Sequence, residues 1–124
     1  MTLRSPVGAA RGLGSARAGT QHWWLQRVTA VALIPLSVWL GGALVAMTGA
    51  DHAHFSAWVA RPLNAVGLTL AIGTALYHFK IGADVVIDDY VHSEGLKIAS
   101  RMANLFGAAV IAAVSAFAVL KLAL

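Results

Sequence analysis

Three apolar stretches, each as long as a bilayer is thick, limit what this chain can fold into. Residues 28–48 and 103–120 carry no charged side chain, and Lys121 follows the second of them. About 20 such residues form a helix that crosses the hydrocarbon core of a membrane. A third stretch, 62–87, is long enough to span with some tilt but contains charged residues. The sequence therefore predicts an all-α integral membrane protein with three transmembrane helices, at about 28–48, 62–87 and 103–123.

The composition agrees with one small membrane domain. Of the 124 residues, 59% are hydrophobic and only 11% are charged, which is more apolar than a typical soluble domain. We assign residues 23–124 to the three-helix domain and residues 1–22, which hold no acidic side chain, to a flexible basic segment before it. The chain has no cysteine. It therefore offers no thiolate for zinc or for an iron–sulfur cluster, and a redox metal would need histidine or methionine ligands.

The basic residues predict the orientation of the helices, because cytoplasmic loops of membrane proteins carry an excess of Lys and Arg. With the N-terminus inside, only Arg61 and Lys121 lie outside. The other basic residues then lie on the cytoplasmic side: Arg4, Arg11, Arg17, Arg27, Lys80, Lys97 and Arg101. We therefore expect a cytoplasmic N-terminus and an outer C-terminus. The net charge of +4 reflects this topology, and we expect no nucleic-acid partner.

Turn and loop signals complete the outline. Pro62 suits the first turn of the second helix, where its missing N–H costs nothing. The segment 48–58 before it is predicted to form an outer loop, and residues 88–100 an inner loop. The acid-free, Arg-rich start also resembles an organellar transit peptide. We expect a bacterial inner membrane as the simpler location, with the mitochondrial inner membrane as the alternative.

The second predicted helix carries the polar residues with functional potential. At 100° per residue, His78, Gly82, Val85 and Asp89 fall on one face. The rise from His78 to Asp89 is roughly 16 Å, so the imidazole lies within the hydrocarbon while the carboxylate reaches the cytoplasmic interface. An ionisable side chain at membrane depth is a candidate functional site. His78 can bind haem iron through a neutral nitrogen, or it can hydrogen-bond across a helix interface.

The neighbouring residues leave further alternatives open. His78 is the only histidine that we place at membrane depth, so a second axial haem ligand would come from another chain. Lys80 and Asp84 stand four residues apart and can pair with each other, while Lys80 can also snorkel to water or meet a haem propionate. Asp89 and Tyr90 can meet the carbonyl group of a membrane-dissolved ligand, or Tyr90 can be an ordinary interfacial aromatic.

The order and spacing of these residues resemble those of a known family. The pattern H-x-x-x-G-x-x-x-x-x-x-D-Y, from His78 to Tyr90, is similar to that of the small hydrophobic membrane anchor of succinate dehydrogenase. The segment QRVTAVAL, residues 26–33, resembles the Arg-x-Thr-Ala segment that opens the first span in that family. Together with helix count and topology, the resemblance covers about residues 20–124.

The resemblance implies a role for each polar residue. His78 would be an axial ligand of haem b, and the partner cytochrome b556 subunit would supply the other histidine. Tyr90 and Asp89 would bind ubiquinone, in a pocket completed by that subunit and the iron–sulfur subunit. Arg27 would lie near the haem propionates or the quinone pocket, or would simply anchor the positive side of the span, and Lys80 would meet a haem propionate. FAD and the iron–sulfur clusters would belong to the flavoprotein and iron–sulfur subunits, so this chain would anchor a succinate:ubiquinone oxidoreductase in membrane lipid and catalyse nothing alone.

Three alternatives remain open. The chain could be the related anchor of a fumarate reductase, which would run quinol oxidation instead. It could be a structural three-helix protein in which His78 and the Lys80–Asp84 pair only hold helices together. It could also be a homo-oligomeric b-type cytochrome, with His78 of two copies sharing one haem.

Overall fold

The computed structural model describes residues 6–10 and 17–124 as an all-helical protein without strands in those ranges. The helices are α1 (Pro6–Ala10), α2 (Arg17–Ala46), α3 (His52–Val59), α4 (Pro62–Tyr90) and α5 (Glu94–Ala123). By length and composition, α2, α4 and α5 can each cross a membrane, over Gly19–Ala46, Pro62–Tyr90 and Glu94–Ala123. The prediction of an all-α protein with three membrane-spanning helices is therefore confirmed.

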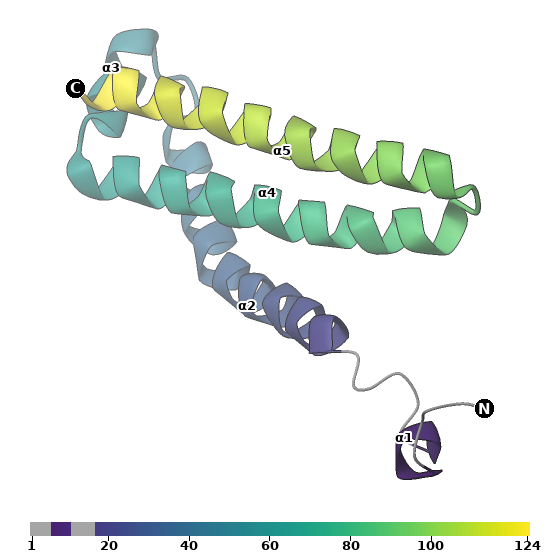
Figure 1. The fold of residues 1–124 in the computed structure, drawn as a ribbon. Coiled ribbons are helices and arrows are strands. Elements are labelled where there is room, and N and C mark those ends of the chain that lie inside the picture. The colour runs from purple at the N-terminus through teal and green to yellow at the C-terminus, as the bar shows by residue number, and fades with distance from the viewer. Residues whose placement is uncertain (1–5, 11–16) are drawn as a thin grey trace.

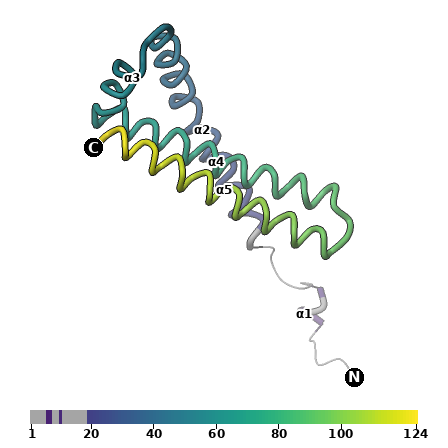
Figure 2. The backbone as a smooth tube through the Cα atoms, turned by 90° about the horizontal axis from the view of Figure 1, so that it is seen from above, coloured from purple at the N-terminus to yellow at the C-terminus, as the bar shows by residue number. Residues whose placement is uncertain are grey.

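The central helix is α4, because both other long helices pack against it. In Figures 1 and 2, α4 and α5 run antiparallel and side by side, while α2 crosses α4 obliquely. The short helix α3 contacts both α4 and α5 near the C-terminus. A side chain on α4 can therefore face α2, face α5 or face outward, and this choice decides what each candidate residue can do.

The structure corrects the predicted outer loop. Residues 52–59 form the helix α3, which begins after Asp51, whose side chain accepts a hydrogen bond of 2.8 Å from the backbone N–H of His54. An N-terminal aspartate of this kind satisfies one of the free N–H groups of the first turn. The prediction that Pro62 lies in the first turn of the next helix is confirmed.

The prediction of an inner loop over residues 88–100 is also wrong, because the observed connection is much shorter. Helix α4 continues to Tyr90 and α5 begins at Glu94, so only residues 91–93 lie between them. Glu94 stands in the first turn of α5, where a negative charge interacts favourably with the helix dipole. Polar residues of 94–101 thus extend the helix beyond its apolar part instead of forming a loop.

An aromatic cluster joins α2, α3 and α4 at the α3 end of the protein. The ring of Trp39 stacks on that of Trp58 with centroids 6.0 Å apart, and the ring centroid of Phe55 lies 6.2 Å from that of Trp58. Gly67 of α4 makes room for this arrangement, because a Cβ there would lie 2.6 Å from the Trp39 ring. Asn64 adds a hydrogen bond of 2.8 Å to the Trp58 carbonyl. This end of the bundle is therefore held by ring packing.

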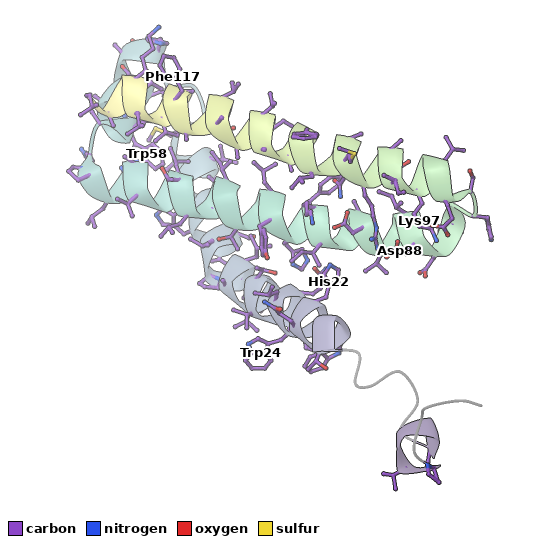
Figure 3. All side chains as sticks on the ribbon, in the orientation of Figure 1. His22, Trp24, Trp58, Asp88, Lys97 and Phe117 are labelled. Carbon is purple, nitrogen blue, oxygen red and sulfur yellow. The ribbon has the colours of Figure 1, made fainter. Side chains whose placement is uncertain are left out.

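Few side chains are buried within the described part of the chain. They are Val59, Ala71, Ile81, Asp84 and Val119. Large apolar side chains on all three long helices stay exposed, and Phe117 on α5 is one of them (Figure 3). An apolar surface of this extent suits lipid tails or the helices of a partner, not water.

The predicted flexible segment, 1–22, falls partly on residues 1–5 and 11–16, which are outside the described residues. Where that segment is described, residues 6–10 form α1 and residues 17–22 belong to the beginning of α2.

Candidate functional site

His78 lies where α2 packs against α4, and both of its ring nitrogens meet side chains of α2. Its Nδ1 is 2.8 Å from the hydroxyl of Thr29, and its Nε2 is 3.4 Å from the amide nitrogen of Gln26. The imidazole therefore bridges two membrane-spanning helices. The hydrogen-bonding role that the sequence allowed for His78 is observed.

A pocket of about 560 Å³ opens beside the imidazole. His78, Gly82 and Val86 of α4 contribute to its lining, and Gln26 contributes from α2. Its volume lies within the range of small-molecule and cofactor sites, about 300–1,000 Å³. The oxygen Oε1 of Gln26 is buried and, within the described part of the chain, has no hydrogen-bond partner. One polar atom of a residue that lines this pocket, the Gln26 Oε1, therefore lacks a hydrogen-bond partner among the described residues.

The residues beside the pocket fit a haem, because His78 offers an imidazole and most of the remaining lining is apolar. Among the described residues, no group of three or more His, Cys, Asp or Glu side chains could hold a metal ion. His22 lines a different pocket, together with Lys80 and Arg101. A haem at His78 would use this imidazole as one ligand, and the Gln26 amide would have to leave Nε2 before iron could approach.

The helical spacing correctly predicted that His78 and Gly82 lie together. A Cβ on Gly82 would lie 3.6 Å from the amide nitrogen of Gln26, an ordinary contact distance, so the Gln26 side chain lies directly over this part of α4. Val85 and Asp89, which the same spacing placed on this face, do not line the His78 pocket. The predicted stripe is therefore shorter than expected.

Asp89 and Tyr90 are the last two residues of α4, and both are exposed. The side chain of Tyr90 is 77% exposed, and its hydroxyl bonds to none of the described residues. Tyr90 stands twelve residues beyond His78 on the same helix, a rise of roughly 18 Å. The two candidate groups thus occupy different levels of α4, with Tyr90 available to a ligand or partner at the helix end.

Lys80 and Asp84 bond to α5, and the pocket beside them is also lined by His22 of α2. The Lys80 ammonium lies 2.7 Å from Asp84 Oδ2, which confirms the predicted pairing. Asn104 of α5 donates from its amide nitrogen to Asp84 Oδ1 at 2.8 Å and to the Lys80 carbonyl at 2.9 Å. Both carboxylate oxygens of Asp84 are therefore bonded, although the residue is only 8% exposed. Buried polar groups of this kind bind helices together inside a membrane. The propionate role of Lys80 stays a prediction.

A second ion pair joins α4 and α5 nearer to their connection. Arg101 of α5 pairs with Asp88, the third residue from the end of α4. Figure 3 shows Asp88 and Lys97 at this end of the bundle, opposite the end that carries Trp58. Both side chains of the pair are well exposed, so we expect a small contribution to stability.

Arg27, the remaining candidate, is exposed on α2. Its guanidinium carbon lies 4.1 Å from the centroid of the Trp23 ring, one helical turn earlier. Such a cation–π contact holds the charge at the start of the span, as expected for a residue at a membrane interface. No hydrogen bond joins Arg27 to His78 among the described residues.

Sequence reasoning missed three residues that hold the candidate site together. Thr29 and Gln26 contact His78 from α2, and Asn104 completes the Lys80–Asp84 cluster from α5. The quoted segment 26–33 contained the first two, but nothing in it shows which side chain faces another helix. A polar residue inside an otherwise apolar span was the one available signal, and it applied to Asn104 as well as to Thr29.

The fold and site together define a helical membrane protein with a pocket beside a histidine of its central spanning helix. The family model for the succinate dehydrogenase/fumarate reductase transmembrane subunit matches residues 1–120. The succinate dehydrogenase hydrophobic membrane anchor subunit of Paracoccus denitrificans is 37% identical over 113 residues, which cover 91% of this chain and 88% of the relative. That of Rickettsia bellii is 38% identical over 96 residues, covering 77% and 76%.

A more distant relative, the succinate dehydrogenase membrane anchor subunit of Reclinomonas americana, is 28% identical over 87 residues, covering 68% of this chain and 72% of its own. No solved structure matches the chain significantly. The chain thus belongs to the succinate dehydrogenase/fumarate reductase transmembrane subunit family, as a succinate dehydrogenase membrane anchor. It is therefore one part of an oxidoreductase complex whose other subunits are separate chains.

Proposed function

We propose that this membrane anchor supplies one axial ligand of a haem b, His78, and one wall of the site where ubiquinone is reduced. The observation that carries the proposal is the position of His78: an imidazole inside a membrane-spanning helix, beside a pocket of about 560 Å³ that the chain does not fill. The cytochrome b556 subunit would provide the second axial histidine. When bound, the haem would store one electron reversibly near the quinone site.

The quinone site would lie at the end of α4. Tyr90 would donate its hydroxyl proton in a hydrogen bond to a quinone carbonyl, and Asp89 beside it would orient the phenol or carry protons from the aqueous side. The exposure of both side chains supports this, because a partner must cover them to form a pocket. The iron–sulfur subunit would deliver electrons there from the flavoprotein, which oxidises succinate.

The proposed location is the bacterial inner membrane, with the start of α2 and the α4–α5 connection on the cytoplasmic side. The relatives from Paracoccus denitrificans and Rickettsia bellii support a bacterial setting. Arg27 at the start of the first span would then lie near the cytoplasmic interface, within reach of a haem propionate or of lipid phosphate.

Replacing Tyr90 with phenylalanine tests the quinone site. We expect succinate-driven ubiquinone reduction by the complex to fall about tenfold, because one hydrogen bond worth about 1–1.5 kcal/mol is lost. Reduction of a water-soluble dye by the flavoprotein should not change. Tyr77→Phe, the same change at an exposed tyrosine within the span, is the matched control. Equal ubiquinone reduction by Tyr90→Phe and wild type would contradict the quinone role.

A further inference from the structure

The contacts around His78 favour one of its two nitrogens as the site of the proton. The Thr29 hydroxyl has one hydrogen, and its oxygen lies 2.8 Å from the Leu25 carbonyl, 3.1 Å from the Gln26 carbonyl and 2.8 Å from His78 Nδ1. Carbonyl oxygens only accept hydrogen bonds. If the hydroxyl donates to one of them, its lone pair is free to accept from an Nδ1–H group.

With the Gln26 carboxamide oriented as in this structure, the contact on the other side of the ring favours one of the two tautomers. The group that faces His78 Nε2 is the amide nitrogen of Gln26, which can only donate. An Nε2–H group would place donor against donor. With the proton on Nδ1, the Gln26 amide donates to the Nε2 lone pair and the Thr29 hydroxyl accepts from Nδ1–H. Every contact then joins a donor to an acceptor.

We propose that Thr29 is a positioning residue for His78, and that it holds the imidazole as the Nδ1–H tautomer with the Nε2 lone pair kept for iron. Gln26 occupies that lone pair until haem binds. This inference rests on the proposed haem ligation by His78. Ligating histidines commonly donate their second N–H to an oxygen, which fixes the ring and makes it a stronger electron donor. In this chain the acceptor is the hydroxyl of Thr29 on α2, which precedes His78 by 49 residues.

The state of Gln26 supports this arrangement. Its Oε1 is buried without a hydrogen-bond partner in the described part of the chain, so only the contact through its amide nitrogen holds the carboxamide beside the ring. At 3.4 Å that contact is long for a hydrogen bond. By contrast, the Thr29 contact at 2.8 Å is of ordinary length. The contact at Nε2, the nitrogen that would bind iron, is therefore weaker than the contact at Nδ1.

The test compares Thr29→Val with Thr29→Ser in the assembled complex. Valine keeps the shape of threonine without the hydroxyl, whereas serine keeps the hydroxyl. In Thr29→Val we expect the midpoint potential of the haem to become more positive, because a weaker imidazole donor stabilises ferric iron less. Haem affinity, measured by transfer to apomyoglobin, should fall roughly tenfold or more, as for other lost outer partners of metal ligands. Thr29→Ser should restore both values.

The matched control is Thr69→Val, because among the described residues the Thr69 hydroxyl bonds only to the carbonyl of Ala65 in its own helix. It should leave the potential and the affinity at their wild-type values. Wild-type values in Thr29→Val would overturn the inference, and so would a Thr29→Ser complex that behaves like Thr29→Val. Failure of the proposed function would look different, since haem would then be absent from the wild-type complex or unaffected by loss of His78.

Discussion

Replacing His78 with alanine should remove the b-type haem from the assembled complex. The change deletes the imidazole that the proposed function assigns to the iron, beside the pocket lined by α4 and by Gln26 of α2. Loss of a residue that is only hydrogen-bonded to a metal ligand already lowers metal affinity about 10- to 100-fold. Loss of the ligand itself should lower it by at least as much. The measurement is the reduced-minus-oxidised absorption of haem b per flavin in the purified complex.

The control for this experiment is His92→Ala, since His92 lies in the short connection between α4 and α5 and is exposed. Its haem content should equal that of the wild type. Flavin in the purified sample reports whether the hydrophilic subunits still assemble. If His78→Ala keeps a full and unshifted haem b spectrum, His78 is not an axial ligand and only its bridging contacts to α2 remain.

Lys80→Met should destabilise the protein by about 3–5 kcal/mol, because it leaves the buried carboxylate of Asp84 without its cation. Asp84 is 8% exposed and lies 2.7 Å from the ammonium, with one further hydrogen bond from Asn104. Denaturant unfolding of the chain in detergent micelles measures this free energy. If the unpaired Asp84 carboxylate took up a proton, that uptake would itself cost free energy at neutral pH. Protonation would therefore remove only part of the destabilisation.

The double variant Lys80→Met/Asp84→Leu separates a lost ion pair from lost packing. It removes both charges and keeps the apolar volume, so most of the stability of the single variant should return. Asp88 and Arg101 provide the comparison: Asp88→Asn, at an exposed pair, should cost about 1 kcal/mol or less. Equal losses in Lys80→Met and in the double variant would show that an unpaired Asp84 carboxylate is not what destabilises Lys80→Met.

Much of the fold could be predicted from the sequence, because apolar length controls membrane insertion directly. The three spans follow from it, and Pro62 and the Lys80–Asp84 spacing describe local geometry within one helix. Helix ends could not be predicted in the same way. Hydropathy shows where lipid surrounds a helix, but α5 begins at Glu94, well before its apolar stretch at residue 103, and α3 forms where a loop was expected.

The candidate site could be predicted only as far as single helices allow. His78 and Gly82 share a face of α4 because their spacing is one turn. The contacts of His78 with Thr29 and Gln26 join residues 49 and 52 positions apart, and they depend on how α2 crosses α4. Side-chain patterns along one helix contain no information on that crossing, nor on why Asn104 faces Asp84 across the α4–α5 interface.

The haem-to-flavin ratio of the complex that co-purifies with this chain tests the central claim most directly. With an affinity tag on this chain and native detergent extraction, we expect flavoprotein and iron–sulfur subunits in the sample, with haem b and flavin in equal amounts. Co-purified hydrophilic subunits without haem b would contradict the proposed role of His78. Haem without any flavin would point instead to a b-type cytochrome made of copies of this chain.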